Sequence, residues 1–463
     1  MSIISKLKGW VAMKFLSWAK QEFKVKPISS EEMQTLISEC ANVYAGKPDW
    51  IEEGEVKTIN FAKALCSETA RLATLDIAVT VEGSARAEYL QKVMDELSSK
   101  IRKWTEYCCA YGSIILKPNG KTVDVVTPEH FTITATQNDR ITGIVFQDTQ
   151  RAQDGEHFYH RLEYHNNDNG KYTVTNKTYF SEGENDIGIP IGIENTPWSD
   201  LDEETTIENA EGNLFAFMVM PHANNIDLDS PLGMPVIADC MEELKDLDIA
   251  YSRHALEIIE SKRIVLVDSD KLLVSKGSYD VRKAKTGLPD MVRIVEGDGA
   301  GGVYQEINPL IQTPVRMEGI NALLSQIGYK CGFSNGYFVF NESMGIQTAT
   351  GVEANQQRTI QYIKDVRDQL QNCLEQLIYA LSAFADGYDL APAGDYDVAY
   401  KFGDITYNVE EDRARWWGYV QAGKVPAWKF FVKFEGMTEE EAKQMVAEAN
   451  ADNKATQELF AME

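Results

Sequence analysis

The strongest constraint on the fold is one helical signal that runs from about Thr348 to Ala385. Apolar side chains recur along it every three or four residues, at Ile360, Ile363, Val366, Leu370, Leu374, Leu377, Leu381 and Phe384. At 1.5 Å per residue this helix is roughly 55 Å long. A single apolar stripe on so long a helix needs a packing partner along its whole length.

The rest of the chain mixes helical and strand patterns, which predicts an α+β fold. Helices are predicted at residues 29–44, 56–75, 84–111 (with a break), 229–262 and 315–331, and again from residue 409. Pro118-Asn119-Gly120 predicts the turn of a β-hairpin within residues 113–126. An antiparallel meander is predicted at 130–135, 141–148, 156–165 and 171–179, with further strands at 263–268, 291–296, 302–307 and 396–402.

Length and charge limit the function classes. The 463 residues suggest two to four domains. With 45 basic against 71 acidic residues the net charge is −26, which argues against a general nucleic-acid coat. This charge remains compatible with a protein that lets DNA slide past without gripping it. No apolar run approaches the ~18–20 residues of a bilayer span, so an integral membrane protein is not expected.

The N-terminus carries an amphipathic helical pattern. Residues 1–26 hold six Lys and one Glu, and Lys14 interrupts the apolar stretch, so a secretory signal fits poorly. The apolar face consists of Ile3, Leu7, Trp10, Val11, Phe15 and Trp18. We favour a helix that docks this face on a neighbouring domain or subunit over the alternative, a helix at a membrane surface.

No residue pattern predicts catalysis, a cofactor or a metal site. The seven Cys are odd in number, with no CxxC pair, which predicts reduced, buried thiols. Gly297–Gly302 satisfies G-x-G-x-x-G, but a strand follows it, so a hairpin turn is the better interpretation. His157, His160 and His165 beside Glu156 are interpreted as surface histidines, with His160 on the opposite face of a strand.

Charge is unevenly distributed along the chain. Residues 182–212 hold ten acidic and no basic residues, which predicts a solvated loop or an acidic surface. Residues 262–313 hold eight basic and seven acidic residues, so this insert between two helices is near neutral. Residues 435–463 again carry eight acidic and two basic residues.

A long helix, a small neutral insert, a second helix, a Gly/Asn-rich loop and a very long helix follow one another in the second half of the chain. This order resembles the portal proteins of tailed bacteriophages, in the branch of siphophages and prophages of Gram-positive hosts. The likeness is carried by Val43–Trp50, Cys66–Leu75, Tyr111–Lys117, Ser230–Gly233 with Asp246–Asp248, and Thr348–Asn355. Thr348-Ala349-Thr350 is the most specific stretch, whereas Gly351 departs from relatives, which tend to place an acidic residue there.

The resemblance implies a portal fold with wing, stem, clip and crown, in which long helices line the channel of a ring. It implies twelve subunits at one capsid vertex, where DNA enters during packaging and leaves during infection. Carried onto this chain, the wing would span 1–228, the stem 229–262 and 314–332, the clip 263–313, the tunnel loop 333–348, a long kinked wing helix and strand 349–402, and a small crown 403–463.

The resemblance also indicates candidate site residues. The tunnel loop facing the DNA channel would include Asn335, Gly336, Tyr337, Asn341, Glu342, Ser343 and Gly345, which are mostly small and polar. In the stem, Lys262 and Arg263 are candidates for phosphate contact, or else ordinary helix-end charges favoured by the helix dipole. On the clip surface, where a motor and an adaptor should dock, lie Lys271, Lys276, Arg282, Lys283 and Lys285, which as rim charges would tune association rate more than affinity.

The implied partners are other copies of the chain, double-stranded DNA, the terminase large subunit, the head–tail adaptor, and the major capsid and scaffolding proteins. The protein would be made in the host cytoplasm and reside in the virion, without stable membrane association and without enzymatic activity. An alternative is a large non-enzymatic adaptor or scaffold of another assembly, which would leave the neutral insert unexplained. A third class, an enzyme using some of the 71 carboxylates, is unnecessary because charged surfaces account for them.

Overall fold

The computed structural model divides the chain into two compact units. Unit 1 comprises Met1–Ser343 and Gln357–Phe402, and unit 2 comprises Met344–Gln356 and Gly403–Glu463. The structure describes residues 14–51, 55–119, 122–138, 140–261, 264–268, 291–295, 304–307, 312–340, 349–403, 409–422 and 424–460.

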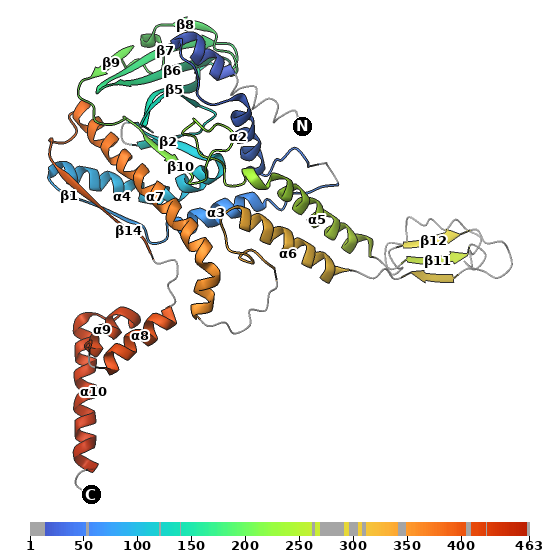
Figure 1. Ribbon diagram of the computed structural model, residues 1–463, viewed down its shortest axis with the longest axis vertical. Helices are drawn as coiled ribbons and strands as arrows, with labels where there is room; N and C mark the ends of the chain where they lie inside the picture. Colours follow the sequence, from blue (N-terminus) through green and yellow to red (C-terminus); the bar gives the residue numbers. More distant parts are fainter. Residues whose placement is uncertain are drawn as a thin grey trace. The chain divides into compact units, whose positions relative to one another are not determined.

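The predicted antiparallel meander is confirmed as the main sheet of unit 1 (Figure 1). Its strands are β4 (Phe131–Gln137), β5 (Arg140–Arg151), β6 (Phe158–Asp168), β7 (Lys171–Ser181) and β8 (Ile189–Ile191), in that order across the sheet. A further strand, β9 (Glu204–Ile207), pairs with β7. The acidic stretch 182–212 is therefore more than a loop, because β8, β9 and the short helix η1 (Ile193–Asn195) lie within it.

Both faces of this sheet are covered. Residues 14–23 form a helix whose Phe15 and Ala19 pack against Val145, Leu162 and Tyr179, so the described part of the N-terminal apolar face docks on the sheet of its own unit, whereas docking on a neighbouring domain or subunit stays a prediction. Residues 1–13 lie outside them. A second core cluster on the same sheet contains Phe131, Ile144, Phe146 and Phe215.

Burial on both faces corrects the interpretation of the histidines. His160 is fully buried and lies 2.9 Å from the hydroxyls of Thr149 and Ser181, and His165 is buried beside Glu163. The prediction that both lie at the surface is therefore wrong. They do lie on opposite faces of β6, as the strand period requires, because Trp18 approaches His160 whereas Phe146 approaches His165.

Three helices precede and follow the first strand. They are α2 (Glu31–Tyr44), α3 (Phe61–Ala73) and α4 (Ala85–Tyr111), while β1 (Ala78–Gly83) lies between α3 and α4. The hydroxyl of Ser30 caps α2 by accepting from the backbone of Met33 at 3.1 Å. The predicted break in α4 is wrong, because α4 runs as one helix from Ala85 to Tyr111.

The residue that follows α4 explains why the helix predicted to begin at residue 229 begins later in the structure. The hairpin strands β2 (Ser113–Asn119) and β3 (Thr122–Val126) are confirmed, and β10 (Ala216–Val219) pairs with β2. A side chain on Gly112 would reach 2.2 Å from the carbonyl oxygen of Gly233, so the two backbones cross in direct contact.

Residues 231–235 beside this crossing have no regular secondary structure, and α5 begins only at Met241 and runs to Glu260. The prediction of a helix from residue 229 is therefore wrong at its start. Pro231 suits the first turn of a helix, but Pro235 adds a second break that the sequence pattern underestimated.

The neutral insert contains the three predicted strands. They are β11 (Ile264–Asp268), β12 (Met291–Val295) and β13 (Tyr304–Ile307), with β11 between a parallel β12 and an antiparallel β13. The chain then enters α6 (Thr313–Lys330), which also confirms its prediction. The glycine-rich motif at 297–302 lies outside the described residues.

The long helix is confirmed as α7 (Ala349–Gly387), whose apolar stripe is almost completely buried in unit 1. Arg367 on α7 donates to the carbonyls of Leu72 and Ala73 at the end of α3. The predicted strand near 396–402 is also present, as β14 (Tyr396–Lys401), and it pairs with β1. The predicted kink in α7 stays a prediction.

Unit 2 consists mainly of the predicted C-terminal helices, α8 (Val409–Gln421), α9 (Ala427–Glu435) and α10 (Glu439–Phe460). α9 packs against both α8 and α10. All seven cysteines of the chain are buried and free, as predicted. None of the helices within the described part of the chain is long and apolar enough to cross a bilayer.

Candidate functional site

The helices α5 and α6 form an antiparallel pair (Figure 1). Near the start of α5, Glu243 accepts hydrogen bonds from Gln326 at 3.0 Å and Lys330 at 2.5 Å, both near the end of α6. At the other end of the pair, Glu257 forms an ion pair with Arg316. Polar contacts at both ends therefore fix the register of the two helices.

Buried polar contacts anchor the first half of α5 to the chain before α3. Asp248 is only 4% exposed and accepts hydrogen bonds from the indole of Trp50 and the backbone N–H of Ile59, both at 2.9 Å. One turn further, the hydroxyl of Ser252 accepts from the backbone of Lys57 at 2.8 Å. Burial raises the pKa of Asp248 above its ordinary value, and the bonds from Trp50 and Ile59 oppose that shift.

A sharp reversal follows α6. Gly332 has a φ of +92°, and a side chain there would lie 2.6 Å from the ring of Tyr362, so glycine is required for both reasons. Phe333 is fully buried, and its ring centroid lies 4.8 Å from that of Phe338. Ser334 is tied to α7 because its backbone N–H donates to the hydroxyl of Thr359 at 2.8 Å.

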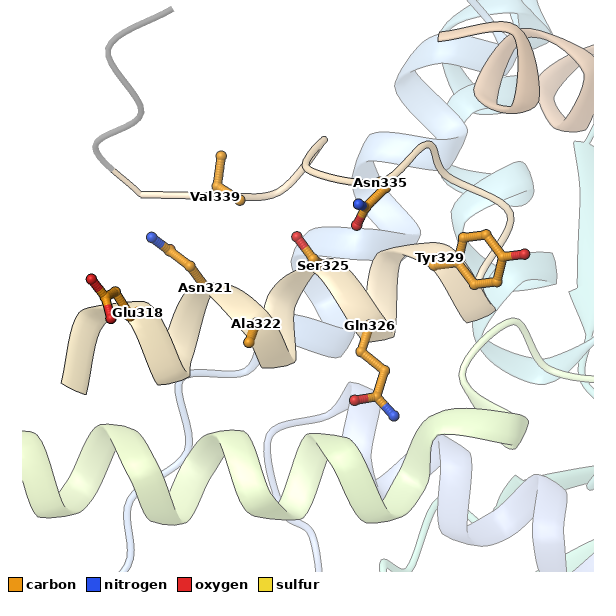
Figure 2. Close-up of a pocket in the computed structure, with 8 residues that line it drawn as sticks. All are labelled: Glu318, Asn321, Ala322, Ser325, Gln326, Tyr329, Asn335 and Val339. Atoms are coloured by element: carbon orange, nitrogen blue, oxygen red, sulfur yellow. The ribbon is translucent and has the colours of Figure 1, made fainter. Parts of the chain in front are cut away.

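After this reversal the chain runs back along α6 and leaves a groove of about 610 Å³ (Figure 2). Asn321 on α6 holds the returning segment, because its side-chain amide accepts from the backbone N–H of Phe340 at 2.8 Å and donates to its carbonyl at 3.0 Å. The groove is lined by Glu318, Asn321, Ala322, Ser325, Gln326, Tyr329, Asn335 and Val339. These side chains offer hydrogen bonds but contain no pair of nucleophile and base.

A second contact ties the returning segment to α3. The hydroxyl of Tyr337 donates to the carboxylate of Glu68 at 2.5 Å, and Arg71 pairs with the same carboxylate at 2.6 Å. The hydrogen bond from Arg71 holds the pKa of Glu68 below its ordinary value, while burial opposes the shift. Burial and the bond to Glu68 raise the pKa of Tyr337, which therefore stays a neutral donor.

The structure places three of the predicted loop residues at this site. Asn335 lines the groove, Tyr337 contacts α3, and Gly336 lies between them with a φ of +77°. The other predicted site residues lie outside the described residues: Asn341, Glu342, Ser343 and Gly345 of the loop, Lys262 and Arg263 of the stem, and Lys271, Lys276, Arg282, Lys283 and Lys285 of the clip.

Sequence reasoning missed the residues that hold the loop in place. Asn321, Glu68 and Thr359 come from three different helices, and Glu68 is separated from Tyr337 by 269 positions. The only available signal was that Glu68 falls within Cys66–Leu75, one of the stretches that carry the portal likeness. In the part of the chain that the structure describes, no group of three or more His, Cys, Asp or Glu could hold a metal ion.

Comparison with known proteins gives the class of this molecule. A family model described as phage portal protein, SPP1 Gp6-like, matches residues 58–455, which is most of the chain. The chain therefore belongs to the SPP1 Gp6-like family of phage portal proteins. A search of the curated proteins finds no match. Portal proteins are bacteriophage capsid components that act in DNA packaging, as a homo-oligomeric ring at a capsid vertex.

Proposed function

We propose that this chain forms a ring of twelve subunits whose axial channel passes DNA during packaging and ejection. The observation that carries the proposal is the α5–α6 pair, which joins the insert to unit 1 and leaves large apolar side chains in solvent. Ile258 and Val315 near the insert are 53% and 65% exposed, and Tyr251 and Leu256 are about two-fifths exposed. Packing of neighbouring copies would remove these side chains from water.

The assignment of regions follows the portal likeness, with one boundary moved. The first stem helix is α5 at Met241–Glu260, and residues 231–237 join it to the wing. The second stem helix is α6, the clip lies between them, and the returning segment after Gly332 begins the tunnel loop. The crown would comprise α8 to α10.

We further propose that the clip is the docking platform for the terminase large subunit and the head–tail adaptor. Its near-neutral, strand-containing sequence suits pairing with other proteins. ATP hydrolysis would belong to the motor and not to this chain, which would act without enzymatic activity of its own. Major capsid and scaffolding proteins would surround the ring, and the host would be Gram-positive. Lys262 and Arg263 remain our candidates for phosphate contact in the stem.

Electron microscopy of the purified full-length protein, with native mass determination, tests this proposal. We expect rings with a central hole and a mass near twelve times 52.0 kDa. Co-expression with the scaffolding protein should produce the same ring. A compact dimer or tetramer without a hole under both conditions would contradict the proposal.

Deletion of residues 337–344 tests the role of the loop separately. The described residues of this segment are held by one hydrogen bond from Tyr337 to Glu68, ring contacts of Phe338 and the bonds between Phe340 and Asn321, so rings should still form. Packaging of DNA in an in vitro assay should be impaired. Normal packaging by rings of the deletion variant would remove the loop from the mechanism.

A further inference from the structure

The half of α5 nearer the insert carries a short apolar stripe that is open to solvent. Tyr251, Ala255 and Ile258 follow one another at spacings of four and three residues, so they lie on one side of the helix. Tyr251 and Ile258 are exposed, and Ala255 between them is half-buried. We call these three residues the α5 stripe. The stripe contains no Asp, Glu, Lys or Arg, so a packing partner would stabilise it more than water does.

Two polar contacts fix the direction in which the α5 stripe points. Glu257 lies on the side of α5 that faces α6, because it pairs with Arg316. Asp248 lies on the side that faces the chain before α3, because it accepts from the indole of Trp50. With about 3.6 residues per turn, the stripe lies between these two sides on one flank of the helix pair, and Leu256 lies on the opposite flank.

The groove along α6 opens on the flank opposite to the α5 stripe. Arg316 lies on the side of α6 that faces α5, and Asn321 lies on the side that faces the returning segment. Val315 and Ala322 lie between these two sides and are both exposed. We call Val315, Ala322 and Gly319 between them the α6 face. A side chain added at Gly319 would meet no atom within 4 Å, so the surface is open there as well.

The helix geometry shows that the two flanks are opposite. Seen along each helix from its own first residue, the α5 stripe lies clockwise from the side that faces the other helix, whereas the α6 face lies anticlockwise from that side. Because α5 and α6 are antiparallel, these opposite rotations lead to opposite flanks of the pair. The stripe and the α6 face therefore cannot contact each other within one copy.

The contacts between the two helices also determine which residues lie at equal heights. Glu257 pairs with Arg316 near the insert. Glu243 accepts from Lys330 at the other end of the pair. Since the helices run in opposite directions with the same rise per residue, each step forward on α5 matches one step back on α6. The residues at equal heights are Ile258 and Val315, Ala255 and Glu318, and Tyr251 and Ala322.

We infer that the α5 stripe of one copy packs on the α6 face of the next copy in the ring and thereby closes the groove along α6. The inference rests on the proposed function, because it needs a ring of copies. In a closed ring each copy meets its two neighbours through different surfaces on opposite sides of the molecule, and these two flanks meet that condition. Rotation about an axis along the helix pair keeps the heights equal. Tyr251 would then lie against the small side chain of Ala322, and Ile258 against Val315.

The other flank of α5 offers no equivalent surface. Leu256 is exposed there, but the same flank carries the exposed charged side chains of Arg253 and Asp246. Leu256 and Ala322 also share one flank, so a contact between them in two copies would relate the copies by a two-fold axis. Such a contact closes into a dimer and leaves no surface that continues a ring.

Disulfide trapping in the full-length protein tests the contact. All seven native cysteines are buried, so the background should be low. Ile258→Cys combined with Val315→Cys, oxidised with copper phenanthroline in air, should give a ladder of covalent multimers on a non-reducing gel. The matched control combines Leu256→Cys with Val315→Cys, whose side chains share one flank, and should give no ladder. Equal ladders from both variants, a ladder from the control alone, or no ladder from either in preparations that contain rings would overturn the inference.

An exchange of side-chain size tests the same contact without new cysteines. Ala322→Leu adds bulk at an exposed position, so each copy should fold, but the larger side chain would clash with Tyr251 of the next copy. Association of the copies, measured by native mass determination, should weaken by about tenfold or more. Tyr251→Ala in the same chain should restore rings, whereas Leu256→Ala should not. Restoration by both substitutions or by neither would contradict the contact.

Electron microscopy of the unchanged protein separates this inference from the proposed function. If the unchanged protein forms no ring, the proposed function fails and the contact fails with it. If the unchanged protein forms rings but the cysteine and size-exchange variants do not behave as described, only the contact between the α5 stripe and the α6 face is wrong.

Discussion

The long helix α7 and the helices α8 and α9 carry apolar side chains in very different surroundings. α7 buries Ile363, Val366 and Leu377 completely inside unit 1. Among the described side chains of α8 to α10, only Phe430 and Ala442 are buried. Unit 1 thus gains stability from a continuous core, whereas unit 2 leaves most of its rings half-covered at a surface.

Two cationic side chains, one in each unit, show the same difference in surroundings. In unit 1, Arg86 is 1% exposed and donates to the carbonyls of Ser382, Ala391 and Pro392, so its charge serves the fold. In unit 2, Lys433 lies exposed over an aromatic ring. The comparison teaches that a cationic side chain can be buried among backbone carbonyls, as Arg86 is, or lie exposed over an aromatic ring, as Lys433 does.

The largest effect should come from breaking the core of α7. Ile363→Asp places a charge at a position with no solvent exposure, which should destabilise unit 1 by more than about 4 kcal/mol and prevent ring assembly. Size-exclusion chromatography with electron microscopy measures this. Lys364→Asp, at the exposed neighbouring position, should assemble normally. Soluble rings of normal size from Ile363→Asp would refute the role assigned to this helix.

Removal of a buried cation should have the next largest effect. Arg86→Ala leaves three backbone carbonyls without their donor and should lower the free energy of unfolding by about 3 kcal/mol. The shift of the midpoint in denaturant-induced unfolding measures this loss of stability. Arg413→Ala removes an exposed pair in unit 2 and should cost less than about 1 kcal/mol. Equal losses for the two variants would erase the contrast between the units.

Phe430→Ala asks whether unit 2 is held by the one ring that is buried among its described side chains. Loss of this side chain should cost about 2 kcal/mol, and only within unit 2. Scanning calorimetry should show an earlier minor transition and an unchanged main transition. If the main transition moved by the same amount, the units would unfold together and could not be compared as separate bodies.

The smallest effect is expected from removing the contact that ties the returning segment to α3. Tyr337→Phe removes one hydrogen bond to Glu68 and should cost about 1 kcal/mol at neutral pH. Because Arg71 and Tyr337 lower the pKa of Glu68 from 4.5, the ionised carboxylate stabilises the folded state above that pH. Unfolding curves recorded at several pH values measure the free energy of unfolding of both proteins. The difference in this free energy between Tyr337→Phe and the unchanged protein should become smaller as the pH falls below 4.5. A difference that does not vary with pH would contradict the contact.

Much of the fold could be predicted from local patterns. The period of apolar residues identified α6 and α7, and alternation with turn residues identified the meander and the hairpin. The start of α5 could not be predicted, because the contact between Gly112 and Gly233 joins two segments far apart in the sequence. β1 and β14 likewise pair across more than three hundred residues.

The candidate site was harder to predict for the same reason. Asn335 and Tyr337 could be named from the portal likeness, but Glu68 and Asn321 contact the loop only because the fold brings them to it. Burial of His160 and His165 was missed because the sequence did not show that helices and strands would cover both faces of β6.

The anchoring of α5 has a mechanical consequence. From Leu244 to Ser252 the helix has buried contacts, and from Arg253 to Ile258 no described side chain is fully buried. The helix pair is thus a cantilever, clamped at Asp248 and free toward its tip. Both ends of the insert connect to this tip, so a force on the insert would bend the two helices together. The contact between Trp50 and Asp248 would resist that bending.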